Sequence, residues 1–117
     1  LKKIHTAFSD TYSLNITDVA WYNKNCKKKT HPVGSKQTNE LGIYDMTGNV
    51  FEWCQDWFGY YSSSSQVNPI GANSGSGRVF RGGSWYDTAM YCRSSYRYGS
   101  SPDFSYSFLG LRLVLSE

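Results

Sequence analysis

The 117-residue sequence lacks the features that mark several large classes of protein. No apolar run is long enough to cross a membrane and no signal peptide is recognisable, so we expect no membrane insertion. The histidines are only His5 and His31, and the cysteines, Cys26, Cys54 and Cys92, have no CxxC spacing, which argues against a zinc site. A Cys54–Cys92 disulfide and a reduced buried pair are equally compatible with this spacing.

Residues 86–108 lack leucine, isoleucine, valine and asparagine altogether. The segment has no regular hydrophobic period, so it is a poor candidate for a core element. It consists mostly of Tyr, Phe and Ser. Tyr and Ser are common in loops that bind a partner, because they combine rigid amphipathic area with adaptable hydrogen bonding. Ser100, Ser101, Ser105 and Ser107 interleave the aromatic residues and would fill a core poorly, which favours a recognition surface.

Aromatic residues, in contrast, are plentiful at 17%, and the mean hydropathy is −0.53. This combination suits one loop-rich domain with a small core, in which we expect Trp53, Trp57 and Trp85. The net charge of +3 comes largely from lysines at positions 24–29. We interpret them as a solvated turn, because no aromatic residue alternates with them to stack on a base, and we expect no nucleic-acid partner.

The residue pattern predicts short strands, little helix and long loops. Thr17 and Asp18 are predicted to cap a short helix that carries Val19 to Tyr22. Strands are predicted over residues 41–45, 50–58, 78–81 and 109–115. The Gly, Ser and Asn residues from 62 to 77 predict a long surface loop. Such a mixture is typical of an α+β domain.

Two sets of motifs resemble a known family. Residues 39–53, NELGIYDMTGNVFEW, resemble the signature of the formylglycine-generating enzyme (sulfatase-modifying factor) family. Its second signature is matched in order and spacing by RGGSW at 81–85, CRS at 92–94, PD at 102–103 and LGLR at 109–112. The resemblance implies an α+β, C-type-lectin-like fold with short strands and long irregular loops. It also implies that residues 1–117 are a single domain, which we expect to be the C-terminal part of a longer family domain.

The family contains copper-dependent oxidases that convert a target cysteine to formylglycine, iron-dependent sulfur transferases and members without catalysis. Ala89 and Ser94 match the two catalytic cysteines of the oxidases, and neither can supply the thiolate that binds Cu(I). Cys92 lies between them, at a position where non-catalytic relatives also carry cysteine. No His-rich cluster offers an iron site. We therefore expect no catalysis, copper or iron. The alternative is a formylglycine-generating or sulfur-transfer oxidoreductase that is complete only in a longer chain.

Within this fold, residues 86–108 also resemble the variable proteins of diversity-generating retroelements. These proteins replace adenine-containing codons, typically Asn codons, in a C-terminal cassette. Met90 is not reachable from an AAC codon in this way. The reachable residues, which the resemblance implies as ligand-binding positions, are Tyr86, Asp87, Thr88, Tyr91, Tyr96, Tyr98, Gly99, Ser100, Asp103, Phe104, Tyr106, Ser107 and Phe108. The implied partner is a protein or glycan on another cell or particle, and the implied location is surface-displayed or particle-associated.

The resemblance also implies a structural calcium ion. In the family, the positions that match Asp45 and Glu52 bind it through side chains, and those that match Gly48 and Val50 bind it through backbone carbonyls. Oxygen-only ligands around a glycine turn suit a hard cation. A catalytic role for Asp45 and Glu52 is disfavoured, because no nucleophile or second base accompanies them.

The remaining polar candidates are interpreted as structural or surface residues. Arg81, Arg93 and Arg112 are predicted to hydrogen-bond loop carbonyls or acids. His31, beside Pro32, is predicted to be an exposed surface residue rather than a ligand.

Overall fold

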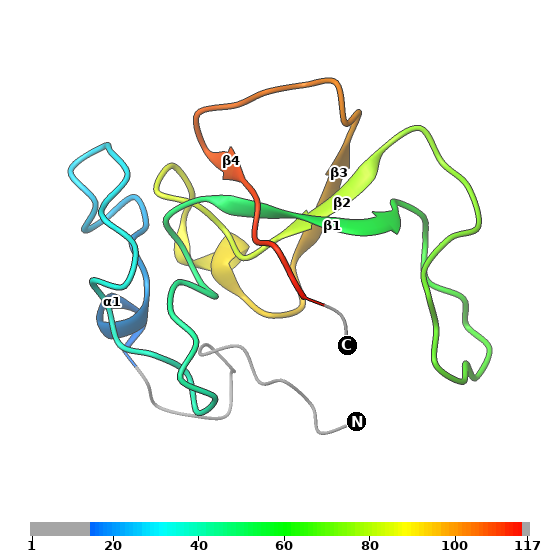
Figure 1. Ribbon diagram of the computed structural model, residues 1–117, viewed down its shortest axis with the longest axis horizontal. Coiled ribbons are helices and arrows are strands. Elements are labelled where there is room, and N and C mark those ends of the chain that lie inside the picture. Colours follow the sequence, from blue (N-terminus) through cyan, green and yellow to red (C-terminus); the bar gives the residue numbers. More distant parts are fainter. Residues whose placement is uncertain (1–14, 116–117) are drawn as a thin grey trace.

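The computed structural model describes residues 15–115, and His5 lies outside this range (Figure 1). The elements are α1 (Ile16–Val19), β1 (Phe51–Trp57), β2 (Arg78–Arg81), the 3-10 helix η1 (Ala89–Cys92), β3 (Arg97–Ser100) and β4 (Leu109–Gly110). The strands form one mixed sheet in the order β3-β2-β1-β4, antiparallel except for the parallel β1–β4 pair. No helix in the described part is long and apolar enough to cross a bilayer. Short strands with long connections confirm the α+β class.

Strands β1 and β2 form because their aromatic residues pack on each other. Trp53 pairs with Phe80 in the antiparallel register, and their rings meet edge-on with centroids 5.6 Å apart. Phe51 lies on the same side, 4.9 Å from Phe80. The register shifts between Trp53 and Trp57, which opposes Arg78 at the far end of the pair. The strand predicted over 78–81 is therefore confirmed with the same bounds, and the strand predicted over 50–58 is confirmed with slightly shorter ends.

The predicted helix is present but starts earlier and is shorter. Asn15, not Thr17 or Asp18, is the N-cap, since its Oδ1 accepts a hydrogen bond of 3.1 Å from the Thr17 N–H. The helix ends at Val19, and its C-cap residue Ala20 has an extended backbone. Trp21 and Tyr22 consequently lie outside it. The helix starts after Asn15 because the Asn15 side chain accepts a hydrogen bond from a backbone N–H that has no partner within the helix.

The strand predicted over residues 41–45 is wrong. Asn39 Oδ1 accepts hydrogen bonds from the Leu41 and Ile43 N–H groups, and the Asn39 N–H donates to the Ile43 carbonyl. These bonds use the groups that a neighbouring strand would need, so the segment closes into a turn. Gly42 and Asp45 have φ values of 75° and 55°, which also exclude a regular strand.

The last strand is much shorter than predicted, and one strand was missed. Only Leu109–Gly110 pairs with β1, and residues 111–115 are exposed. The Arg112 side chain turns back to Glu52, where it forms a salt bridge. Strand β3 lies inside the segment expected to be irregular, because its backbone pairs with β2 from Arg97 to Ser100.

The core is small and does not contain the tryptophans. Its buried apolar residues are Val19, Ala20, Tyr22, Cys26, Phe51, Val79, Phe80 and Cys92. Trp53, Trp57 and Trp85 are only part-buried, so the prediction that they form the core is wrong. The Trp85 indole N–H donates to the Ser107 carbonyl, and the Arg78 guanidinium lies 3.5 Å above the Trp57 ring. Indole rings with such partners remain at the edge of the core.

Candidate functional site

Aromatic rings from two segments form a continuous row, which we call the aromatic ladder. Its members, in spatial order, are Phe104, Tyr106, Phe108, Tyr86 and Trp85. The centroids of Phe104 and Tyr106 are 6.0 Å apart, and those of Tyr106 and Phe108 are 5.0 Å apart with nearly parallel planes. Phe108 stacks on Tyr86 at 6.2 Å, and Tyr86 meets Trp85 edge-on at 5.6 Å. The fold thus brings residues 85–86 beside residues 104–108.

Three rings of the ladder are open to solvent, and Phe108 is fixed to the framework. Tyr86 is 68% exposed, Phe104 58% and Tyr106 38%. Phe108 is part-buried and meets Phe51 of the core edge-on, and its carbonyl accepts a 2.8 Å hydrogen bond from the Phe51 N–H. The ladder is therefore an exposed apolar surface on a rigid base.

The other predicted aromatic positions lie outside the ladder. Tyr91 and Tyr96 are part-buried and pack edge-on at 4.8 Å. Burial, followed by the neighbouring Tyr91, raises the pKa of Tyr96. Tyr98 is 56% exposed on β3, where its ring lies 5.8 Å from Phe80. Of the predicted aromatic binding positions, Tyr86, Tyr98, Phe104 and Tyr106 are therefore exposed, whereas Tyr91, Tyr96 and Phe108 are part-buried.

The non-aromatic predicted positions have mixed surroundings. Thr88, Asp103 and Ser107 are exposed, while Gly99 and Ser100 are part-buried within β3. A Cβ at Gly99 would approach Phe58 to 2.5 Å, so this position has no room for a side chain.

Asp87 is part-buried, and its carboxylate accepts a hydrogen bond from the Ser84 hydroxyl. Burial raises the pKa of Asp87, and the hydrogen bonds from Ser84 partly oppose this shift. The Asp87 side chain is therefore turned toward the protein rather than presented to solvent.

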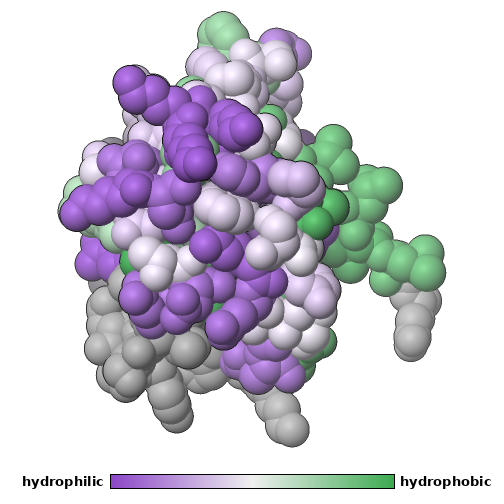
Figure 2. Space-filling model, turned by 90° about the vertical axis from the view of Figure 1, so that its left-hand side faces the viewer, coloured by the Kyte–Doolittle hydropathy of each residue, from purple (hydrophilic) through white to green (hydrophobic). Residues whose placement is uncertain are grey.

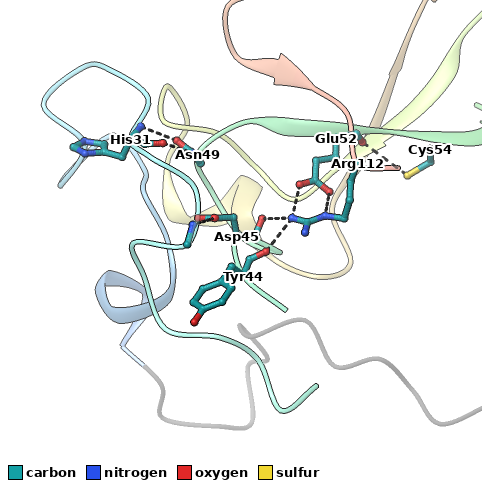
Figure 3. A network of polar contacts seen from close by, with 8 residues as sticks. His31, Tyr44, Asp45, Asn49, Glu52, Cys54 and Arg112 are labelled. Atoms are coloured by element: carbon teal, nitrogen blue, oxygen red, sulfur yellow. Dashed lines mark hydrogen bonds and ion pairs between the residues drawn. The ribbon is translucent and has the colours of Figure 1, made fainter. Parts of the chain in front are cut away.

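The predicted calcium ligands lie together. Asp45, Gly48, Val50 and Glu52 all line one pocket of about 560 Å³. Arg112 also lines it and clamps Glu52, with its Nε 2.9 Å from Oε2 and its Nη2 2.7 Å from Oε1 (Figure 3).

Three further contacts complete this network. Arg112 Nη2 also donates to the Tyr44 and Asp45 carbonyls, and Asp45 Oδ2 accepts from the Gly34 N–H (Figure 3). The pKa of Arg112 is raised, and the hydrogen bond to Glu52 is the largest cause of this shift. No group of three or more His, Cys, Asp or Glu side chains gathers within residues 15–115. Carboxylate and carbonyl oxygens are the ligands that a hard cation prefers. In the structure, Arg112 already balances the negative charge of Glu52.

The positions matched to catalytic cysteines lie near a second pocket. Cys54, Cys92 and Ser94 line this pocket of about 460 Å³, and Ala89 lies outside its lining. All the cysteines are free thiols in the structure. Burial, followed by Asp87, raises the pKa of Cys92 to about 12, and burial also raises that of Cys54. Thiols with raised pKa values are poor nucleophiles and poor copper ligands at neutral pH.

The arginines have the structural contacts that the sequence predicted. Arg81 donates to the Ser94 carbonyl at 3.1 Å and to the Tyr61 hydroxyl at 3.0 Å. Arg93 Nε donates to the Met90 carbonyl at 3.2 Å. Their main contacts are loop carbonyls, as planar multi-donor groups allow.

His31 is not the exposed residue that the sequence predicted. Its ring is part-buried and stacks on Trp21 with centroids 3.7 Å apart. The backbone N–H donates to Asn49 Oδ1, while the Asn49 amide donates to the His31 carbonyl (Figure 3). His31 Nε2 lies 2.8 Å from the Cys26 carbonyl and therefore carries the proton of that hydrogen bond. The neighbouring Pro32, beside which His31 was predicted to be exposed, does not indicate this packing.

Sequence and structure comparisons identify several similar proteins. The family described as sulfatase-modifying factor enzyme 1-like domain matches residues 5–117. The solved structure of Treponema denticola variable protein 1 superposes with a TM-score of 0.78 at 43% identity, over 82% of this chain and 35% of that chain. PvdO from Pseudomonas aeruginosa superposes with a TM-score of 0.71 at 26% identity, over 91% and 42% respectively.

A relative with an enzymatic name is similar as well. The formylglycine-generating enzyme of Streptomyces coelicolor is 43% identical over 88 residues, which cover 71% of this chain and 28% of the relative. The chain thus spans less than half the length of each of these proteins.

Proposed function

Because the chain belongs to the sulfatase-modifying factor enzyme 1-like domain family, we propose that it is a non-catalytic ligand-binding domain with a C-type-lectin-like fold. The aromatic ladder carries this proposal. Three of its rings are exposed, it lies on loops, and Phe108 packs on Phe51 of the sheet. The similarity to a protein named variable protein 1 supports the same role.

The ladder suits binding because its exposed rings add apolar contact area outside the core. Large aromatic side chains dominate the energetics of many interfaces, and Tyr and Trp are enriched at binding hot spots. Tyr86, Phe104 and Tyr106 expose enough surface to serve in this way. Loops on a rigid scaffold tolerate exchange, because the core does not depend on them. The ligand is a protein or glycan on another cell or particle.

Absence of catalysis is the second part of the proposal. Ala89 and Ser94 occupy the positions that match the catalytic cysteines, and the raised pKa of Cys92 keeps its thiol protonated at neutral pH. The alternative remains an oxidoreductase of the formylglycine-generating or sulfur-transfer kind, complete only in a longer chain. Incubation with copper and a cysteine-containing peptide separates the two. Turnover by this chain would contradict a purely binding role.

Sequencing the same locus from several isolates tests the variable surface directly. We expect substitutions to crowd at the codon-accessible positions of residues 86–108 and to spare Phe51 and Phe80. Substitutions spread evenly along the chain would contradict a diversified surface.

A binding screen tests the ladder itself. The chain is applied to arrays of surface proteins and glycans beside the variant Y86S/F104S/Y106S. The control variant, Y60S/V67S/I70S, changes residues that are 98%, 89% and 84% exposed in another loop. We expect array signals to disappear with the ladder variant and to persist with the control. Equal signals from both would argue against the ladder as the binding surface.

We also propose that Asp45, Gly48, Val50 and Glu52 hold a structural calcium ion. Their shared pocket and oxygen donors support this. When bound, the ion would supply positive charge that joins the turn at residues 47–49 to the start of β1. Glu52 would then interact with both the cation and Arg112.

A further inference from the structure

A turn rich in lysine lies against the aromatic ladder. This lysine turn comprises residues 23–29 and carries Lys24, Lys27, Lys28 and Lys29. The Asn23 N–H donates to the Asp87 carbonyl at 3.0 Å, and the Cys26 thiol donates to the Trp85 carbonyl at 3.0 Å. In Figure 1 the cyan turn accordingly lies beside the yellow segment that carries Trp85 and Tyr86. Buried Cys26 fixes this arrangement from within.

The charge of the turn is uncompensated by nearby acids. From position 19 to position 39 the chain contains lysines but no Asp or Glu. All the lysines of the turn are exposed, and the only ion pair found in residues 15–115 joins Arg112 to Glu52. Asp87 contacts the turn through its backbone carbonyl, and its carboxylate is turned toward Ser84. Figure 2 shows hydrophilic residues over much of this side of the molecule.

The backbone of the turn indicates that the lysine side chains matter. Lys27 and Lys28 have φ values of 53° and 57°, in the left-handed region. Glycine enters this region freely, and asparagine enters it more readily than lysine does. The backbone conformation at positions 27 and 28 would by itself favour glycine or asparagine over lysine. A role for their ammonium groups accounts for them.

We propose that the lysine turn is a constant, basic rim of the ligand surface and that the partner is a protein with an acidic patch. The inference rests on the proposed binding role of the ladder and specifies the partner's chemistry. Protein interfaces commonly combine an aromatic centre with a polar rim. Rim charges mainly accelerate association and make binding sensitive to salt.

The ladder's geometry favours a protein over a nucleic acid. Tyr106 and Tyr86 each stack on Phe108, so a neighbouring ring engages at least one face of each of these rings. Binding of single strands relies on open aromatic faces that accept bases. Ring edges and tyrosine hydroxyls, in contrast, suit the mixed apolar and polar surface of a protein.

The test uses defined probes in place of the natural partner. A labelled random copolymer of glutamate and tyrosine represents an acidic protein surface, and polyglutamate, heparin and duplex DNA serve for comparison. Binding to the full chain is followed by fluorescence anisotropy at low and at physiological salt. We expect the copolymer to bind most tightly per unit charge. Tighter binding of DNA or heparin would overturn the acidic-protein assignment.

The decisive variant is K27N/K28N, because asparagine fits the left-handed backbone better than lysine does. We expect unchanged or higher thermal stability together with roughly tenfold weaker copolymer binding at low salt, an effect that diminishes at high salt. The control K36Q removes a lysine that is not part of the turn and whose ammonium group lies over Trp21. Binding by K27N/K28N as tight as that by K36Q would overturn the proposed rim.

A ladder variant separates this inference from the proposed function. Y86S/Y106S should lose the preference for the glutamate–tyrosine copolymer over polyglutamate. If that preference persists while K27N/K28N binds weakly, the lysine turn is a docking site and the ladder is not. If the preference is lost while K27N/K28N binds normally, the ladder binds and the basic rim is refuted.

Discussion

At the scale of single residues, similar aromatic side chains have different roles according to their position in the backbone. Phe51 is 4% exposed and contacts Phe80 and Phe108. Tyr86 carries a ring of similar size and is 68% exposed. Phe108 joins the two groups, since it contacts Phe51 on one side and stacks on Tyr106 and Tyr86 on the other. Substitutions at core and ladder positions should therefore have different energetic consequences.

The first prediction compares Phe51 with Tyr86 and Tyr98. Phe51→Ala should lower the free energy of unfolding by about 3–5 kcal/mol, as expected for a buried aromatic residue. Tyr86→Ser and Tyr98→Ser, at 68% and 56% exposed positions, should change it by about 0.5 kcal/mol or less. Denaturant unfolding of the three variants measures this. Equal losses at all three positions would show that the exposed rings support the fold.

The second prediction concerns the buried thiol of Cys92. Its pKa of about 12 lies above the model-compound value of 9.0, because burial disfavours the thiolate. The unfolded thiol therefore ionises first as the pH rises. The contribution of the Cys92 thiol to the free energy of unfolding is therefore fully present below about pH 9, and it is lost as the pH rises toward about 12. Unfolding experiments across this window should show a weaker pH dependence for Cys92→Ala than for the parent chain.

Thiol labelling provides an independent measurement of the same shift. In the native state at mildly alkaline pH, part-buried Cys54 should react before Cys92 and Cys26, which are both buried. Rapid native-state labelling of Cys92 would contradict its burial and its raised pKa.

At the scale of elements, Arg112 joins three parts of the chain that are distant in sequence. It follows β4, forms a bidentate pair with Glu52 of β1, and donates to the carbonyls of Tyr44 and Asp45. Arg112→Lys keeps the charge but loses the planar set of donors. The side chains of Arg112 and Glu52 are 34% and 22% exposed, so we expect a modest loss of about 1 kcal/mol. Denaturant unfolding of R112K tests this, and an unchanged midpoint would mean that the clamp contributes little.

The calcium proposal also belongs to this scale. If the ion binds, calcium should raise the melting temperature and a strong chelator should lower it, because a ligand specific to the native state stabilises it by mass action. Saturation at about 100 times Kd corresponds to about 2.7 kcal/mol. Asp45→Asn should weaken the response, while Asp56→Asn, outside this pocket, should keep it. A melting temperature that no chelator changes would remove the proposal.

The sequence predicted the strands that are determined by the packing of alternating aromatic residues. It failed where hydrogen bonds to a side chain, or backbone pairing with another strand, determine the structure. Alternating aromatic residues identified β1 and β2. The turn at residues 41–45 was mistaken for a strand because the amide of Asn39 is the decisive partner. Strand β3 escaped detection because RYGS has no alternating pattern, and only its pairing with β2 defines it.

The same distinction applies to the candidate site. Composition indicated that residues 86–108 are unlike a core, but it could not show which rings stack. Trp85 was assigned to the core, whereas the structure places it at one end of the ladder. The contact of the lysine turn with Trp85 and Asp87 joins residues separated by many positions, which periodicity cannot reveal.

At the scale of the whole molecule, a small core supports a large exposed apolar surface near the C-terminal end of the described chain. Leu111, Leu113, Val114 and Leu115 are 68%, 89%, 86% and 95% exposed. They follow β4, which is the edge strand of the sheet. Figure 2 shows hydrophobic residues that project on one side of the molecule. An apolar segment that continues an open sheet edge favours association between molecules.

The last prediction tests this consequence. L113S/L115S should reduce concentration-dependent self-association, measured by light scattering, and change the free energy of unfolding by about 0.5 kcal/mol or less, because both side chains are already exposed. V67S/I70S removes side chains that are 89% and 84% exposed from a loop away from β4, and so controls for a general gain in polarity. Equal improvement by both variants would exclude a specific effect of the sheet edge. A large loss of stability in L113S/L115S alone would show instead that residues 113 and 115 pack on the fold in solution.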